Sequence, residues 1–124
     1  MTGETKKLKD EYQEIGITEC RKRMIPVTDA LAVLHGRWKI PIVLVLSYEN
    51  RRFKEIVRAI PGLTDKSLSK ELKEMAEDQL VERIVFDTFP PKVEYRLTEH
   101  ARSLCDVIEA LREWGIKHRK KILG

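Results

Sequence analysis

Three lysines recur at helical spacing in the segment IPGLTDKSLSKELKEM, residues 60–75. Lys66, Lys70 and Lys73 are four and three residues apart, so on a helix they project from one side. Their ammonium groups are point charges that bind anions. A stripe with one sign of charge therefore predicts that this side of the helix meets an anionic partner. The alternative interpretation is a solvated surface on which the lysines pair with acidic neighbours such as Glu77.

Apolar residues around the stripe show which elements position it. Within residues 64–78 they repeat at helical spacing opposite the lysines, at Leu68, Leu72, Met75 and Ala76. Thr64 stands at the expected N-cap of this helix. The preceding segment RRFKEIVRAI also has a single apolar face, and Pro61 and Gly62 end it. Two helices joined by a short turn that contains glycine are predicted, which is a helix-turn-helix layout.

Two β-rich runs, LVERIVF and KVEYRL, follow the second helix. Apolar and polar residues alternate in the second run, and the connection DTFPPK holds too much proline for a helix. The pattern predicts a β-hairpin with its tip at residues 87–92. A hairpin directly behind a helix-turn-helix is the arrangement of a winged helix. The predicted fold class is therefore mainly α with a small β-hairpin (α+β).

A long C-terminal helix is expected to begin at Thr98. Its apolar stripe is broader than one small domain needs to cover, so we expect part of it to form a dimer interface. The expected interface residues are Leu104, Ile108, Leu111 and Trp114. Cys105, on the same helix, is expected to act as a small apolar group.

The N-terminal half of the chain is patterned less clearly. Leu8, Tyr12 and Ile15 fall at helical spacing and predict an N-terminal helix. Thr28 is the expected N-cap of a separate short helix that stops at Gly36. The apolar run IPIVLVL, residues 40–46, fits a buried strand or a buried helix, and Pro41 favours the first turn of a helix.

Composition indicates a single domain with an anionic partner. The 124 residues carry a formal charge of +4 and a pI near 9.1, which favours nucleic acid or a membrane surface as the partner. No apolar run reaches the ~20 residues of a membrane span, and the first residues contain no hydrophobic signal segment. We therefore expect a cytoplasmic protein that does not enter a membrane.

Catalytic and metal-binding patterns are missing from the sequence. The three histidines, His35, His100 and His118, are scattered and have no carboxylate or cysteine cluster at metal-ligand spacing. Cys20 and Cys105 are far apart and form no CxxC motif. Neither a phosphate-binding loop nor a nucleophile elbow occurs. We expect no enzyme activity, no metal and no cofactor.

Four segments carry a resemblance to a known family. They are PVTDALAVLHGRWKIPIVLVL, RRFKEIVRAIPGLTDKSLSKELKEM, LVERIVFDTFPPKVEYRLTEHARSL and EALREWG. In this order, over about residues 26–115, they resemble the HxlR family of bacterial winged helix-turn-helix transcriptional regulators. The resemblance implies a homodimer, built through terminal helices, that binds partly palindromic double-stranded operator DNA. It also implies that residues 40–48 are helical, and it leaves the effector unknown.

Three regions are expected on this basis. Residues 1–25 form an N-terminal arm for dimerisation, and residues 26–98 form the DNA-binding domain. Residues 99–124 form the C-terminal dimerisation helix with its basic tail.

Candidate DNA contacts follow from the side chains of the recognition helix, residues 64–78. It contains no Arg, Asn or Gln, the residues that make bidentate contacts to guanine or adenine. Base readout is therefore expected from Lys66, Ser67 and Lys70, with Thr64 and Asp65 near them, and further specificity from half-site spacing and DNA shape. The expected phosphate contacts are Arg51, Arg52, Lys54, Ser69 and Lys73. Lys92 is the expected contact of the wing, and Phe89 either joins it or packs on its own sheet.

Cys20 is a candidate redox or electrophile sensor. Members of the family often carry a cysteine directly before the proline that here is Pro26, and that position is Ile25. Cys20 lies within ECRKRM, where basic neighbours favour a reactive thiolate. The alternative is a cysteine that is merely tolerated at this position.

A second function fits the same distribution of charge. A winged helix can serve as a protein-interaction module whose basic face meets an acidic protein partner. The dependence of binding on salt and on duplex sequence distinguishes this alternative from a DNA reader.

Overall fold

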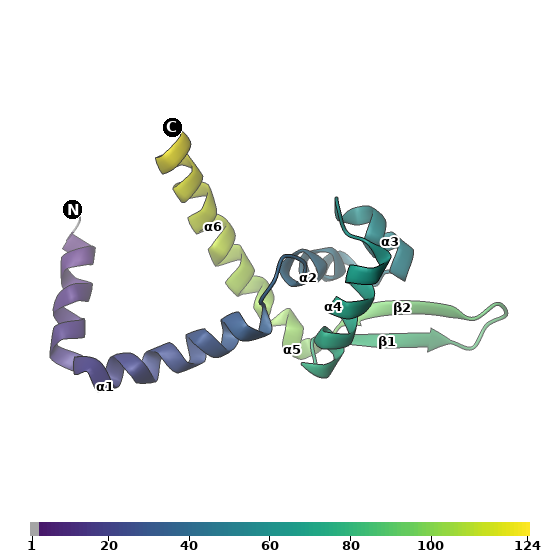
Figure 1. Ribbon diagram of the computed structural model, residues 1–124, viewed down its shortest axis with the longest axis horizontal. Helices are drawn as coiled ribbons and strands as arrows, with labels where there is room; N and C mark the ends of the chain where they lie inside the picture. The colour runs from purple at the N-terminus through teal and green to yellow at the C-terminus, as the bar shows by residue number, and fades with distance from the viewer. Residues whose placement is uncertain (1–2) are drawn as a thin grey trace. The chain divides into compact units, whose positions relative to one another are not determined.

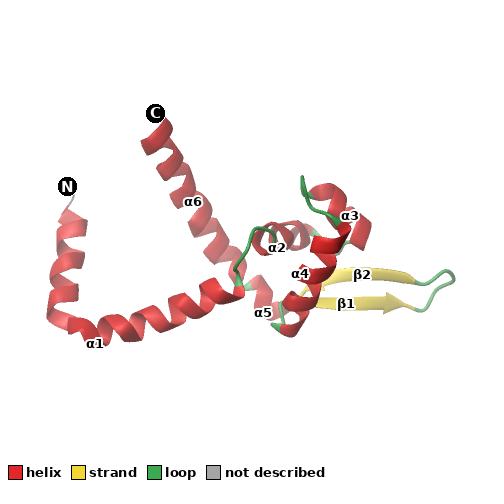
Figure 2. Cartoon of the chain, viewed as in Figure 1, coloured by secondary structure: helices red, strands yellow, loops and turns green. Residues whose placement is uncertain are grey.

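The computed structural model describes the chain from residue 3 to residue 124, with side chains described from residue 16 onward. The chain divides into two compact units, Met1–His35 and Gly36–Gly124. Helices dominate the described residues, and the sheet among them is a two-stranded antiparallel hairpin (Figure 2). The predicted fold class, mainly α with a small β-hairpin, is confirmed.

The first unit contains α1, Gly3–Val33, which bends at Gly16. Gly16 has φ 83° and ψ 172°, a conformation that glycine adopts without the clash a Cβ would cause. The predicted N-terminal helix is therefore confirmed for the backbone. The side chains of Leu8, Tyr12 and Ile15 lie outside the described part of the structure.

The predicted helix start at Thr28 is wrong, because α1 continues through this residue. Pro26 also lies inside α1, where its fixed φ is compatible with a helix. Its ring nitrogen has no hydrogen to donate to the carbonyl of Lys22. Residues 21–30 are all exposed, so water can satisfy that carbonyl. A threonine followed by an acidic residue is thus not sufficient to begin a new helix here.

The second unit, residues 36–124, is a winged helix-turn-helix (Figure 1). Its elements in chain order are α2 (Lys39–Tyr48), α3 (Phe53–Ala59), α4 (Asp65–Glu77), β1 (Val81–Phe86), β2 (Lys92–Leu97), α5 (Glu99–Arg102) and α6 (Leu104–Leu123). The run 40–46 is therefore helical, with Pro41 in the first turn of α2. Thr98 caps a helix as predicted, but Ser103 separates the short α5 from α6.

The hairpin is extended by a bridge to the segment before α3. Within the hairpin, Val81 lies opposite Leu97 and Phe86 lies opposite Lys92. The backbone of Arg51 donates to Tyr95 O at 3.1 Å and accepts from Tyr95 N at 2.7 Å. This bridge joins the middle of β2 to the segment before α3, while the tip of the hairpin extends away from the helices (Figure 1).

The core of this unit lies between the helices and the base of the hairpin. Its fully buried apolar side chains are Ile42, Val43, Leu46, Ile56, Leu68, Met75 and Ala101. Burying one large aliphatic side chain stabilises the fold by ~1.5–3 kcal/mol relative to exposure. The apolar seam of α4 thus packs against α3 and β1, which leaves its other side free for solvent.

Hydrogen bonds also fix the C-terminal end of α4. Gln79 takes the left-handed conformation with φ 59°. Leu80 N donates to Met75 O at 2.8 Å and Gln79 N donates to Ala76 O at 3.1 Å, which together form a Schellman motif. The hydroxyl of Thr98 then donates to Gln79 O at 2.7 Å. These bonds join the end of the recognition helix to the start of α5.

Candidate nucleic-acid interface

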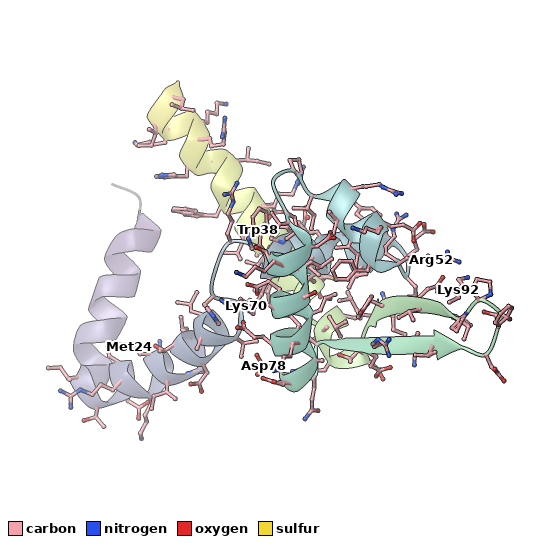
Figure 3. All side chains as sticks on the ribbon, turned by 45° about the vertical axis from the view of Figure 1, so that its right-hand side comes forward. Met24, Trp38, Arg52, Lys70, Asp78 and Lys92 are labelled. Carbon is pink, nitrogen blue, oxygen red and sulfur yellow. The ribbon has the colours of Figure 1, made fainter. Side chains whose placement is uncertain are left out.

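The lysine stripe of α4 is exposed, and Leu68, Leu72 and Met75 of its apolar seam are buried, whereas Ala76 at the edge of the seam is exposed. Lys66, Lys70 and Lys73 lie within about 60° of one another around the helix, at 100° per residue. None of the three forms an ion pair with another described residue. Lys70 is labelled on α4 in Figure 3. The surface is therefore available to an anionic partner.

The turn between α3 and α4 depends on a glycine and a tryptophan. Leu63 N donates to Ile60 O at 3.2 Å across the turn, and Gly62 has φ 84°. A Cβ on Gly62 would lie 3.5 Å from the edge of the Trp38 ring. Arg37 stacks over the other part of that ring, 4.5 Å from its centroid. The HGRWK and IPG segments, distant in sequence, therefore meet at the turn.

The first turn of α4 uses several predicted DNA contacts for its own structure. Thr64 caps the helix by accepting a hydrogen bond from Ser67 N at 3.1 Å. Asp65, which suits the positive end of the helix dipole, pairs with Lys54 of α3 at 2.5 Å. Ser69, one turn further on, is exposed. Thr64, Asp65 and Lys54 are thus engaged within the chain.

The two arginines before α3 differ in their surroundings. Arg51 pairs with Glu49 at 2.8 Å, and its buried Nε makes no hydrogen bond. Arg52, labelled in Figure 3, is exposed, and its backbone N–H donates to Glu55 Oε1 at 2.7 Å. The side chain of Arg52 is therefore the more accessible cation of the two.

The wing places a lysine beside an aromatic ring and leaves its tip exposed. Lys92 pairs with Glu94 at 3.1 Å and lies 4.9 Å from the centroid of the Phe86 ring. Phe89 is 100% exposed at the tip. The option that Phe89 packs on its own sheet is therefore wrong, because the hairpin tip extends beyond the elements that would cover it (Figure 3).

Arg58 of α3 was missed by the sequence analysis. It borders a cleft of about 560 Å³ between α3 and the wing, together with Arg52, Lys54 and Lys92. Arg58 follows Lys54 by four residues on a helix, and this spacing was the available signal. The cleft thus gathers cations from two elements.

Arg83 of β1 was also missed. It borders a second cleft, of about 250 Å³, between α4 and the hairpin, with Ser69, Lys73 and Tyr95. Apolar side chains complete the lining: Phe53, Leu72, Ala76 and Val81. Alternation along β1 places Arg83 on the same side of the hairpin as Val81, which packs toward α4. Lys73 and Arg83 therefore face one cleft from two elements.

Lys39 is a buried cation that contacts one flank of α4. Its side chain is 1% exposed, and its Nζ lies 2.6 Å from Glu71 Oε2 and 2.6 Å from Glu74 Oε2. Burial acts to lower the pKa of Lys39, but hydrogen bonds and the charges of the two carboxylates outweigh it, so the pKa is raised above its usual 10.5. The sequence did not predict these partners of Lys39, which lie 32 and 35 residues further along the chain.

The predicted dimer stripe on α6 is only partly accessible. Ile108 belongs to the core of the chain itself, with 6% of its surface exposed, and Leu104 is half-buried. Leu111 and Trp114 are exposed, and the Trp114 ring stacks on His118 with centroids 4.9 Å apart. The exposed part of the stripe thus begins at Leu111.

Cys20 is a half-buried free thiol on α1. It borders a hollow of about 340 Å³ with Arg23, Met24, Val27 and Thr28, all from the same helix. Neighbouring Lys22 pairs with Glu19 at 3.1 Å. The thiol therefore lies on the apolar side of α1.

The described residues offer neither a metal site nor a membrane-spanning helix. No three His, Cys, Asp or Glu side chains there gather in a way that would hold a metal ion. No helix in the same part of the chain combines the length and apolar character needed to cross a membrane.

Known proteins are similar to this chain in sequence and in structure. The model of the HxlR-like helix-turn-helix family matches residues 33–122. YtcD, an HTH-type transcriptional regulator of Bacillus subtilis, is 38% identical over 106 residues, which cover 86% of this chain and 84% of YtcD. BH0655 of Halalkalibacterium halodurans, another HTH-type transcriptional regulator, is 42% identical over 95 residues, covering 76% of this chain and 84% of BH0655.

Solved structures of transcriptional regulators are also similar to this chain. The crystal structure of YtcD superimposes with a TM-score of 0.70 at 38% identity, covering 76% of this chain and 96% of that chain. The redox regulator HypR in its reduced form gives a TM-score of 0.72 at 36% identity, covering 79% of this chain and 96% of that chain.

Proposed function

This chain belongs to the HxlR-like helix-turn-helix family of transcriptional regulators, and from that premise we propose that it binds double-stranded operator DNA as a homodimer. The recognition helix α4 enters the major groove, and the wing at residues 87–92 contacts the backbone or the minor groove. The observation that carries the proposal is the exposed stripe of Lys66, Lys70 and Lys73 opposite the buried seam of α4.

The contacts divide by what each side chain can reach. Lys66 and Lys70 point away from the seam and are assigned to base edges. Ser67 is assigned to the same role, although it is half-buried on the flank of α4 and its hydroxyl accepts a hydrogen bond from Thr64 Oγ1 at 3.1 Å. Phosphates are assigned to Arg51, to Ser69 and to the cations around the two clefts, which are Arg52, Lys54, Arg58, Lys73, Arg83 and Lys92. Lys54 reaches a phosphate only by leaving Asp65, so its contribution is smaller than its charge suggests.

Dimerisation is assigned to apolar side chains of the terminal helices. Leu111 and Trp114 of α6 are exposed, and Trp114 is the largest of these side chains, with 63% of its surface accessible. On α1, Met24 and Leu31 are exposed at helical spacing. Covering these surfaces with a second copy gives a twofold assembly, and its two recognition helices then read half-sites of a partly palindromic operator.

Cys20 remains a candidate sensor of oxidants or electrophiles. Among the relatives, HypR is a redox regulator whose structure is known in reduced and oxidised forms. Alkylation of Cys20 in a Cys105→Ser background is expected to change DNA affinity. Complete alkylation with unchanged affinity would show that the thiol is merely tolerated.

The test of the function is a salt titration on DNA. A duplex from the region upstream of the protein's own gene is compared with a random duplex, and selection from random duplexes supplies a second target. A DNA reader loses affinity steeply with salt and prefers its target by about 1,000-fold or more. Equal, weak binding to both duplexes would instead favour the protein-interaction module with an acidic partner.

A further inference from the structure

Lys39 occupies a position in α2 at which a positive charge does not stabilise that helix. It is the first residue of α2, where the helix dipole favours negative charge. The N-cap, Trp38, provides no side-chain hydrogen bond to compensate. The reason for a lysine at this position therefore lies outside α2.

Its partners are two carboxylates of the recognition helix. Glu71 and Glu74 are three residues apart on α4, and each places Oε2 2.6 Å from Lys39 Nζ. A buried ion pair contributes little net stability compared with apolar residues of similar size, but it requires one particular geometry. The ion pair therefore fixes one orientation of α4, whereas apolar packing alone would allow the helix to slide.

The two glutamates lie on the flank of α4. At 100° per residue from Leu68, they stand at about 300° and 240°, whereas the lysines stand at about 140–200°. The apolar seam of α4 faces the core, and the ion pair lies to one side of it. The ion pair therefore restrains rotation of α4 about its own axis. A rotation of about 20° at a radius of 5–6 Å moves a side chain by about 2 Å. That displacement is enough to break a hydrogen bond to a base edge.

We infer that Lys39 is a positioning residue for DNA recognition. Its ion pair with Glu71 and Glu74 fixes the rotation of α4 and thereby aims Lys66 and Lys70 at the bases. Trp38, the neighbouring residue, packs at the Gly62 turn, so the segment 37–39 restrains both the turn and the helix that follows it. This inference rests on the proposed DNA-binding function.

The decisive variant is Lys39→Met combined with Glu71→Leu. It removes one positive and one negative charge, so the net charge and the long-range attraction of DNA are unchanged. Buried apolar replacements preserve packing, and Glu74, whose side chain is 31% exposed, can turn to water. The matched control is Glu109→Gln with Arg112→Gln, which removes an exposed ion pair on α6.

Affinity is measured for a duplex selected by the unaltered protein and for a scrambled duplex of the same length. Thermal unfolding and circular dichroism establish that each variant is folded. The Lys39/Glu71 variant is expected to bind the selected duplex at least tenfold more weakly. Its affinity for the scrambled duplex, and the salt slope of that affinity, should stay within about twofold of the unaltered protein. The control variant should retain full discrimination.

Several outcomes are informative. A folded Lys39/Glu71 variant that retains full discrimination would overturn the inference. If that variant does not fold, the exchanged variant Lys39→Glu with Glu71→Lys decides, because it restores one cation between two carboxylates. Retained discrimination in the exchanged variant supports the inference, and its loss or a failure to fold overturns it. Absence of discrimination in the unaltered protein would reject the proposed function itself, before any variant is compared.

Discussion

Lys54 of α3 and Asp65 of α4 form an ion pair across the turn of the helix-turn-helix, with 2.5 Å between Nζ and Oδ2. Both side chains are more than half exposed, and both are predicted DNA contacts. Asp65 lies at the positive end of the α4 dipole, which it suits, but its charge repels a phosphate. The pair therefore limits how strongly this edge attracts DNA.

Replacing Asp65 with asparagine should release Lys54 to a phosphate. We expect severalfold tighter binding to all duplexes at low salt, and a salt slope steeper by about 0.9. Loss of the favourable dipole interaction should lower the unfolding free energy by about 0.3–1 kcal/mol. Fluorescence anisotropy at several salt concentrations measures the first effect. Glu109→Gln, which releases Arg112 on α6, is the control, and equal slopes for both variants would contradict the prediction.

Lys70→Ala tests base readout by the recognition helix. If Lys70 contacts a base edge, its removal should cost about 1–3 kcal/mol on the selected duplex and relax the preference at one position. Lys73→Ala, in the cleft beside the hairpin, should instead weaken binding to all sequences alike. Binding to a panel of duplexes with single base changes measures both variants. A uniform loss for Lys70→Ala would reassign it to a phosphate.

Arg83→Gln tests the cleft between α4 and the hairpin. Its guanidinium and the Lys73 ammonium border the same cleft, so we expect Arg83 to hold a phosphate. The variant should bind every duplex more weakly, with a salt slope reduced by about one. Arg96→Gln is the matched control, because Arg96 lies on the opposite face of the hairpin and pairs with Glu82. The same reduction in both variants would argue for a general charge effect.

The sequence predicted those parts of the interface that depend on local order. The cap at Thr64, the seam of α4 and the Gly62 turn are set by residues within a few positions of one another, and all three are confirmed. Hairpin formation follows from alternation and the proline-rich tip in the same way.

The sequence did not predict which residues far apart along the chain contact one another. Lys39 and Glu71 are 32 residues apart, and no periodicity within either helix indicates that they meet. Thr28 shows the converse error: it carries a local cap signal, but α1 continues through it, with Pro26 inside the same helix. Residues 40–46 stayed ambiguous from their pattern because a fully buried helix and a buried strand are both apolar throughout.

Gln79→Gly should stabilise the protein. Gln79 occupies the left-handed conformation, which costs a residue with a Cβ about 1–2 kcal/mol, and its backbone carbonyl alone accepts the bond from Thr98. Glycine removes this cost but adds entropy to the unfolded chain, so we expect a net gain of about 0.5–1 kcal/mol. Urea denaturation measures it. Gln79→Ala keeps a Cβ and should show no gain. Equal unfolding free energies for the Gln79→Gly and Gln79→Ala variants would mean that the left-handed conformation of residue 79 does not destabilise the protein.

Alkaline pH should reveal the Lys39 ion pair through stability alone. The pKa of Lys39 is raised in the folded state from 10.5, so the charged form is favoured by folding. Its contribution to the unfolding free energy is therefore complete below about pH 10.5 and is lost as the pH rises through the folded-state pKa. Between the two pKa values the loss approaches about 1.4 kcal/mol per pH unit.

The measurement is urea denaturation of the unaltered protein and of the Lys39→Met/Glu71→Leu variant across the alkaline range. Titration of the other lysines and of the tyrosines is common to both proteins, so the difference between the two unfolding free energies isolates Lys39. That difference should be constant from about pH 7 to 10 and should then shift in favour of the variant. A constant difference throughout would mean that Lys39 gains no proton affinity on folding. In that case the 2.6 Å contacts to Glu71 and Glu74 would not outweigh the burial of its charge.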